Sequence, residues 1–256
     1  MTDPTSPDFA LSEAGSTQLQ ALHTLSALGW RYLTRAEADR QRGHRRTNVL
    51  LDDILGQQLA TLNRIRRGER SYPFSEANIA TAVERLHDVR FDGLLRTNEA
   101  VTDLLQLGIA LPQKIDGQTR EWQLRYVDWN DWRGNAFHMT AEFPVDWPEG
   151  TPIRPDIVLF VNGIPFAVIE VKHAREKVEQ GISQQLRNQK PDIGSPNLFF
   201  SAQLLVAGNS HQPRYATIGT PAKLWSRWKE QEDDEEYTAF SSPPNVRRMY
   251  ESTAIG

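Results

Sequence analysis

The residues best suited to chemistry lie in one short stretch of the chain, from Arg154 to Lys172. Asp156 opens one apolar run, and a Glu-x-Lys sequence that begins at Glu170 closes a second run. Ionised groups at the ends of buried strands are costly unless something pairs with them. A divalent metal would pair with two carboxylates, and a scissile phosphate would pair with the lysine. The stretch therefore predicts metal-dependent cleavage of phosphodiester bonds.

Each of these groups has a defined role in such a reaction. Asp156 and Glu170 offer hard carboxylate oxygens to Mg²⁺, and the backbone carbonyl of Val171 offers a third oxygen. Lys172 follows Glu170 by two positions, which in a strand places both side chains on one face of the sheet. There the lysine would orient or deprotonate the attacking water, or cover the negative charge that develops on the phosphate. A strand end with solvated charges would show the same spacing, so that interpretation stays open beside the catalytic one.

The turn between the two apolar runs constrains how the two acids can meet. Asn162-Gly163 between apolar runs is a strong hairpin signal. A two-residue loop alone would place Asp156 opposite Ile169 and turn Glu170 to the other face. A shared metal site therefore requires the register to shift by one residue. A three-residue loop with a bulge at the glycine would do this, and so would a bulge further along the strands.

The elements that must position these residues follow from the spacing of apolar side chains. Helical spacing predominates before Pro112, and alternation typical of strands follows it. We expect helices over 12–29, 49–62, 78–86, 99–107, 180–189 and 223–229, and strands over 122–129, 135–145, 198–207 and 215–218 besides the hairpin of 156–172. This order predicts an α/β fold in which a mixed β-sheet is flanked by helices.

Length and composition indicate how the chain is divided into domains and in which cellular compartment the protein works. The 256 residues are enough for one large domain, expected at 11–229, between a disordered N-terminus at 1–10 and an acidic linker at 230–256. The absence of cysteine excludes disulfides and thiolate metal sites. No apolar run approaches the length that spans a membrane, and the first residues lack the pattern of a signal peptide. These features predict a cytoplasmic protein with no membrane partner.

Charge is unevenly distributed along the chain, although its formal net value is only −4. The segment from Arg31 to Arg70 holds ten arginines and no lysine. Arg42, Arg45 and Arg46 form its densest run and are candidates for contacts with phosphates. Arg187, in the helix expected after Lys172, offers another path for DNA. A solvated surface explains the arginine run equally well, and both interpretations stay open.

The sequence resembles the N-terminal nuclease domain of the motor (R) subunit of type I restriction enzymes, within the PD-(D/E)xK nuclease superfamily. The resemblance is carried by Arg-Pro-Asp at 154–156, Asn-Gly-x-Pro at 162–165, Ile-Glu-x-Lys at 169–172, Leu28-Gly29-Trp30, residues 49–63 and 135–143, and Gln185. It implies a restriction-endonuclease-like fold and a Mg²⁺-dependent endonuclease that acts on double-stranded DNA. It also implies a complex with methyltransferase and specificity subunits, and a role for Gln185 in orienting the site or touching DNA.

The sequence departs from the pattern of that family in three places. It has no Gly-x-x-x-x-Gly-Lys-Ser/Thr phosphate loop, so ATP would serve only a helicase motor outside this chain, toward which the acidic linker would lead. Gln189 stands where the family has a tyrosine, so an amide would face the DNA. The first helix of the family supplies a third acid, for which Glu13 is the candidate metal ligand here. Gln18 lies deeper in that helix and is the other candidate for the same position.

Two other functions fit the same residues. The domain could be a catalytically silent module of the same fold that docks DNA or partner subunits. It could also be a nuclease of the same superfamily with a repair role. Binding of a divalent metal separates the first of these from a nuclease.

Overall fold

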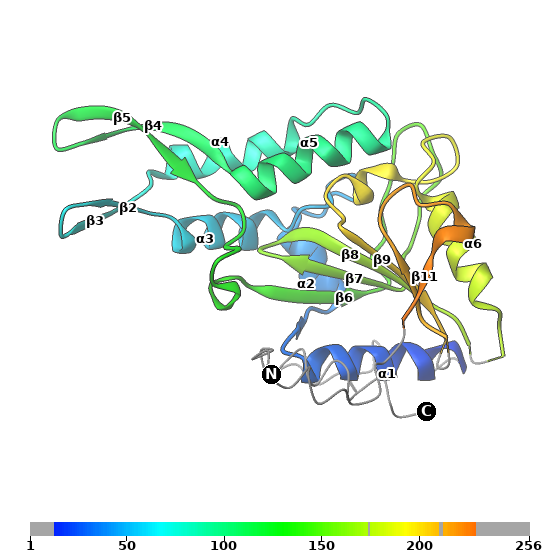
Figure 1. Cartoon of the computed structure of the whole chain (residues 1–256). Coiled ribbons are helices and arrows are strands. Elements are labelled where there is room, and N and C mark those ends of the chain that lie inside the picture. The colour runs from blue at the N-terminus through cyan, green and yellow to red at the C-terminus, as the bar shows by residue number, and fades with distance from the viewer. Residues whose placement is uncertain (1–12, 174, 210–211, 229–256) are drawn as a thin grey trace.

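The computed structural model of the chain describes residues 13–173, 175–209 and 212–228, so the predictions for 1–10 and 230–256 fall outside the described residues. Within these ranges the body is a seven-stranded mixed sheet with helices packed on both faces (Figure 1). The strands are β1 (Arg31–Tyr32), β6 (Phe137–Ala141), β7 (Ile157–Val161), β8 (Ile164–Val171), β9 (Leu204–Gly208), β10 (Arg214–Ala216) and β11 (Ser226–Arg227), in the order β1-β6-β7-β8-β9-β10-β11. This architecture confirms the predicted α/β fold class.

The two faces of the sheet are covered by different helices. Leu22 and Leu25 of α1 (Glu13–Ala27) pack on one face, against a cluster that includes Ile157 and Leu159 of β7. The opposite face carries α2 (Arg35–Gln41), the start of α3 (Asp52–Leu62) and α6 (Val178–Asn188). Alternation along β7 and β8 explains the division, because neighbouring strand residues point to opposite faces. No helix in the described part of the chain has the length and apolar character needed to cross a membrane.

The hairpin of β7 and β8 turns at Asn162-Gly163, as the sequence predicts. Both residues have positive φ, 53° and 84°, which is the backbone of a two-residue type I′ turn. The asparagine is fully buried, and its side chain accepts from Ala136 N and donates to the Tyr126 carbonyl. Leu51 N donates to the Gly163 carbonyl at 2.8 Å. The turn is thus anchored inside the protein.

Replacing Gly163 with alanine should destabilise the fold by more than about 2 kcal/mol, because positive φ and close packing act together. A Cβ there would lie 2.7 Å from the Leu51 carbonyl oxygen and 2.9 Å from Leu55 N. Gly117 has a similar φ of 82° with open space around it, so Gly117→Ala isolates the conformational part, about 1–2 kcal/mol. Urea unfolding of both variants measures the difference, and equal losses of stability would contradict the packing argument.

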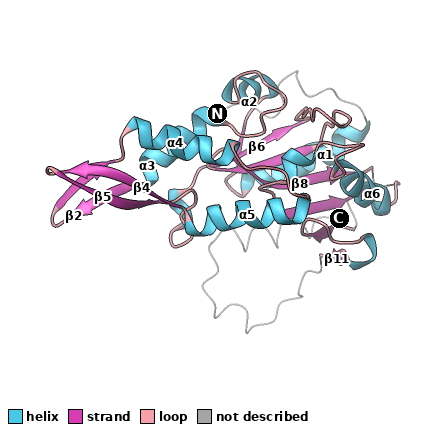
Figure 2. Ribbon diagram, turned by 90° about the horizontal axis from the view of Figure 1, so that it is seen from above, coloured by secondary structure: helices cyan, strands magenta, loops and turns pink. Residues whose placement is uncertain are grey.

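Two further hairpins extend from the body and form what we call the arm: β2 (Arg64–Arg67) with β3 (Arg70–Pro73), and β4 (Ile109–Ile115) with β5 (Gln118–Leu124). Figures 1 and 2 both show the arm leaving the molecule on the side opposite α6. Its base packs under α4 (Glu76–His87) and α5 (Leu94–Leu107) in an apolar cluster of its own. That cluster also receives Val161 and Ile164, which flank the buried turn.

Several elements differ from the sequence predictions. The strand expected over 198–207 begins only at Leu204, because Pro196–Phe199 forms a buried 3₁₀ turn whose apolar run imitates a strand. The strand expected over 122–129 is the end of β5, which stops at Leu124 where Asn63 bonds both to Arg125 N and to its carbonyl. The helix expected over 223–229 is a 3₁₀ turn, Ala222–Leu224, followed by β11. The sequence predictions also missed α2, β1, β4 and the β2–β3 hairpin.

Candidate nuclease site

A β-bulge brings the two acids together. Pairing along the hairpin shifts between Leu159 and Phe160, so that Phe160 faces Pro165 while Leu159 faces Ala167. Ile157 therefore faces Ile169, and the same register places Asp156 opposite Glu170. The turn itself keeps two residues. The one-residue shift of register that a shared metal site needs is therefore made by the bulge further along the strands. Asp156 and Glu170 together are called the acid pair below.

Asp156 is held in place from several sides. One carboxylate oxygen, Oδ2, accepts a hydrogen bond from Val171 N at 2.7 Å. The backbone carbonyl of the same aspartate accepts from Gln18 Nε2 at 2.8 Å and from Glu142 N at 3.0 Å. The bond to Val171 joins the start of β7 to the end of β8, so it fixes the aspartate beside Glu170. The side chain is only half-buried and stays within reach of solvent.

Glu170 is the most unusual group of the site. Its side chain is 0% exposed, and neither carboxylate oxygen has a hydrogen-bond partner among the residues that the structure describes. Burial, together with the negative charge of Asp156, raises the pKa of Glu170 to about 9, although the cations of Lys172 and Arg187 act in the opposite direction. A buried carboxyl without partners is expensive in an ordinary core. Its two free oxygens are instead suited to a cation.

Lys172 lies beside the acid pair on the same face of β8. Its Nζ is 4.0 Å from Glu170 Oε2 and donates to Gln184 Oε1 at 2.7 Å. The lysine stem packs against α6 at Gly181, where a Cβ would lie 3.5 Å from Lys172 Cγ and 3.3 Å from Ala207 Cβ. The glycine inside α6 therefore lets the helix approach the end of the sheet closely. The partner of the lysine, Gln184, is not among the site residues predicted from the sequence.

Gln185 and Gln189 are both buried, which changes the roles predicted for them. Gln185 donates to the carbonyls of Val168 and Val206, on the neighbouring strands β8 and β9. Its Oε1 is buried and has no hydrogen-bond partner in the described part of the chain. It therefore contacts the strand that carries Glu170 and does not face DNA. Gln189 donates to the Gln185 carbonyl and accepts from Gly219 N. Its prediction as a DNA contact is wrong, because both ends of its amide are used inside the fold.

The arginines predicted to contact DNA separate into two kinds. Arg42 is 0% exposed; its guanidinium bonds to Asp39 and the Pro144 carbonyl and lies 4.3 Å from the centre of the Phe143 ring. The prediction for Arg42 is wrong, since every part of this cation is engaged in packing. Arg45, Arg46 and Arg187 are exposed and remain candidates for phosphate contacts.

The third acid predicted from the first helix is not found among the described side chains. Glu13 opens α1, but its side chain lies outside the described part. The residue of α1 that contacts the site is Gln18, through the Asp156 carbonyl. A carboxylate missed in the sequence, Glu142, follows β6 and forms an ion pair with Arg154 at 2.6 Å. Its backbone N–H bonds to Asp156, so it stands at the edge of the site.

The donor set fits a hard divalent cation. The described residues contain no cluster of three or more His, Cys, Asp or Glu side chains with the arrangement of a closed metal site. Mg²⁺ keeps several waters and is held by few carboxylates, so the acid pair suffices in number. The unpartnered oxygens of Glu170 are the observation that favours a cation here. The Val171 carbonyl remains a predicted third ligand.

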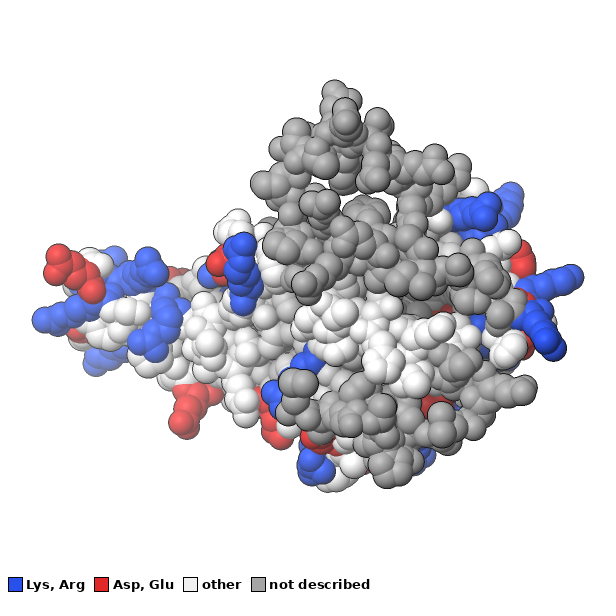
Figure 3. Space-filling model, turned by 90° about the horizontal axis from the view of Figure 1, so that it is seen from below, with Lys and Arg blue, Asp and Glu red and all other residues white. Residues whose placement is uncertain are grey.

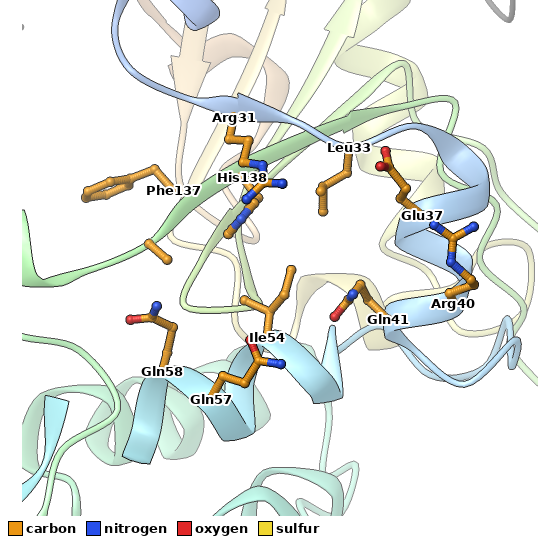
Figure 4. Close-up of a pocket in the computed structure, with 11 residues that line it drawn as sticks. Arg31, Leu33, Glu37, Arg40, Gln41, Ile54, Gln57, Gln58, Phe137 and His138 are labelled. Atoms are coloured by element: carbon orange, nitrogen blue, oxygen red, sulfur yellow. The ribbon is translucent and has the colours of Figure 1, made fainter. Parts of the chain in front are cut away.

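A separate cavity of about 490 Å³ lies between α2, α3 and the edge of the sheet (Figure 4). Figure 4 shows Arg31 beside His138, with Gln41 and Gln57 on the facing helices. Burial, aided by the charge of Arg31, lowers the pKa of His138 to about 4, so this imidazole is neutral at physiological pH. Neither member of the acid pair lines the cavity. It is therefore distinct from the nuclease candidate.

The mixed sheet, its bulged central hairpin and the acid pair with a lysine define a restriction-endonuclease-like α/β domain. A family model described as the N terminus of the type I restriction enzyme R protein matches residues 10–223, and the chain belongs to this family. It is 25% identical over 222 residues to the type I restriction enzyme HindI endonuclease subunit of Haemophilus influenzae, covering 86% of this chain and 20% of that protein.

A second relative is the type I restriction enzyme SsaAORF53P endonuclease subunit of Staphylococcus saprophyticus. It is 29% identical over 105 residues, which cover 41% of this chain and 11% of that protein. The chain thus spans about a fifth or less of the length of these two relatives. Activities and partners of the whole subunits come to this chain only as proposals.

Proposed function

We propose that this domain is the Mg²⁺-dependent endonuclease of a type I restriction complex and hydrolyses phosphodiester bonds in double-stranded DNA. The observation that carries the proposal is the buried Glu170 carboxyl, without hydrogen-bond partners, facing Asp156 beside Lys172. Membership of the family supports the restriction role. Methyltransferase and specificity subunits would be the partners, and a helicase motor outside this chain would use the ATP.

Each residue of the site has a role in this proposal. Asp156 and Glu170, with the Val171 carbonyl, would hold Mg²⁺, which when bound lowers the pKa of water and offsets phosphate charge. Lys172 orients the attacking water and stabilises the negative charge that builds on the phosphate. Gln184 accepts from the lysine Nζ and holds it toward the acid pair. Gln185 is a positioning residue, since it touches the strand that carries Glu170 and not the substrate.

A calorimetric Mn²⁺ titration of the chain tests the metal site. Wild type should bind Mn²⁺, while Asp156→Asn and Glu170→Gln should each lose the binding because one of two carboxylate ligands is removed. Asp53→Asn, which removes an exposed acid of α3, is the matched control and should bind like wild type. Equal binding by all four proteins would reject the site. Absence of binding even in wild type would favour the silent docking module.

Arg45 and Arg46 should contribute to DNA affinity through phosphate contacts. Replacing both with serine is expected to flatten the log–log salt dependence of binding by about 1.8 units, because each lost phosphate contact removes about 0.9. The loss should be the same for all DNA sequences, since phosphate contacts carry no sequence information. Fluorescence anisotropy at several salt concentrations measures the slope. An unchanged slope would assign this loop to solvent or to a partner subunit.

A further inference from the structure

The arm carries a concentration of positive charge that the nuclease site does not use. Its first hairpin holds four arginines within seven residues, Arg64, Arg66, Arg67 and Arg70. Figure 3 shows Lys and Arg side chains gathered over the projecting arm. The second hairpin adds Lys114 and Arg120, against Glu69, Asp116 and Glu121 over both hairpins. The arm is thus net positive in a chain whose total charge is −4.

Side chains along β2 point alternately to the two faces of the hairpin, so its arginines divide between the face that packs on the second hairpin and the face that points outward. Ile65 is 3% exposed and belongs to the apolar cluster, and Arg67 on the same side of the strand donates to the Ile115 carbonyl. Arg64 and Arg66 point to the other side and are exposed, and Arg64 also donates to Ser71 of β3 across the hairpin. Two such residues lie about 7 Å apart along a strand, which suits successive phosphates of one nucleic acid strand.

The second hairpin holds the first one in a fixed position. Arg67 and the Tyr72 hydroxyl both donate to the Asp116 carboxylate, so an ion pair and a hydrogen bond join the two hairpins near the tip of the second one. At the base, Gln113 donates to the Pro73 carbonyl and accepts from Ser75 N. A pair of hairpins tied at both ends presents its outward arginines without the entropic cost of ordering a flexible tail.

We propose that the arm is a second duplex-DNA contact, made through phosphates by Arg64 and Arg66 at a distance from the cleavage site. The buried turn beside the arm and the acid pair lie at opposite ends of the same hairpin, about 20 Å apart along the strands. The arm projects further outward from the turn end (Figure 1). It therefore engages phosphates well away from the scissile bond and holds the duplex in line with the acid pair. This inference rests on the proposed nuclease function.

Salt-dependent DNA binding of the chain in EDTA tests the charge contribution of the arm. Arg64→Ser/Arg66→Ser should flatten the log–log slope by about 1.8 units, equally for unrelated duplexes. Arg90→Ser/Arg96→Ser removes the same charge from two exposed positions, one before α5 and one in its first turn, and should leave the slope unchanged. A slope that is unchanged in the arm variant would overturn the assignment. A slope that flattens equally in the arm variant and in Arg90→Ser/Arg96→Ser would also overturn it.

A crosslinking measurement locates the contact directly. The chain has no cysteine, so Glu69→Cys places a single thiol at the tip of the arm and Glu99→Cys places one on α5. A thiol-attached photocrosslinker should capture duplex DNA at least about tenfold better from position 69, as local phosphate contacts predict. Capture of another restriction subunit in place of DNA in the assembled complex would overturn the proposal.

These outcomes are separable from those of the nuclease proposal. If wild type binds Mn²⁺ while the arm variant keeps the wild-type salt slope and the tip of the arm does not crosslink to DNA, the arm assignment fails and the metal site stands. If the slope flattens and the tip crosslinks DNA while Asp156→Asn leaves Mn²⁺ binding unchanged, the arm assignment stands and the metal site fails.

Discussion

Replacing Lys172 with alanine in the complete restriction subunit is expected to lower the rate of DNA cleavage by about 10³-fold, while the domain still folds. The lysine Nζ touches Glu170 at 4.0 Å and Gln184 at 2.7 Å, and it lies at the open end of the sheet. In the proposed mechanism its charge would therefore serve the phosphate and the attacking water. Because burial raises the pKa of Glu170 to about 9, its carboxyl is expected to be protonated at neutral pH without metal, so loss of the lysine should leave no ionised group in the core.

Plasmid cleavage by the assembled complex measures this effect. Lys190→Ala, which removes an exposed lysine just beyond α6, is the control for general loss of charge and should cut like wild type. Lys172→Arg should restore part of the rate, since a cation returns to the site with different geometry. DNA binding by Lys172→Ala should change little compared with cleavage. A Lys172→Ala complex that cuts at the wild-type rate would remove the lysine from the mechanism.

Glu170→Gln should stabilise the metal-free domain at neutral pH and destroy its response to Mg²⁺. The folded-state pKa of Glu170, about 9, lies above its ordinary value of 4.5, so between these values the folded chain binds more protons than the unfolded chain. The stabilisation from this group is fully present below 4.5 and is lost as the pH rises toward 9. The slope approaches at most about 1.4 kcal/mol per pH unit, because one proton is involved.

The glutamine variant lacks this slope because its amide does not titrate. Near pH 7.5 its free energy of unfolding in EDTA should exceed that of wild type by about 2–4 kcal/mol, and near pH 5 the two should nearly agree. Saturating Mg²⁺ should reverse the order, since the cation displaces the proton in wild type and stabilises only the protein that binds it.

Urea unfolding at two pH values, in EDTA and in Mg²⁺, makes the comparison. Glu179→Gln, an exposed carboxylate of α6, is the matched control and should follow wild type in every condition. A wild-type stability that stays constant between about pH 5 and about pH 8 would show that Glu170 is ionised in the folded chain. Equal Mg²⁺ responses of wild type and Glu170→Gln would show that the cation binds elsewhere.

The positions of the central elements could be predicted because the signals are local. Apolar periodicity located α1, α3, α4 and α6 to within a few residues and found the second half of α5, which begins earlier, at Leu94. Asn162-Gly163 marked the turn that the structure shows. The short strand β1 escaped prediction because its partner β6 lies far away in the sequence. The strand β11 and the basic hairpin β2–β3 escaped it because their polar composition hides the alternation.

The sequence by itself determined the chemical groups at the site, namely Asp156, Glu170 and Lys172 at the ends of two strands joined by an Asn-Gly turn. Whether the two acids share a face was decided only in three dimensions, because one bulged residue reverses the direction of every side chain beyond it. The tertiary structure also decided which charged side chains are buried. Arg42 reads like its exposed neighbours Arg45 and Arg46 in the sequence, yet packing against Phe143 encloses it entirely. Residue type and spacing specify which chemistry is available, and the long-range packing of helices on the sheet specifies which groups can perform it.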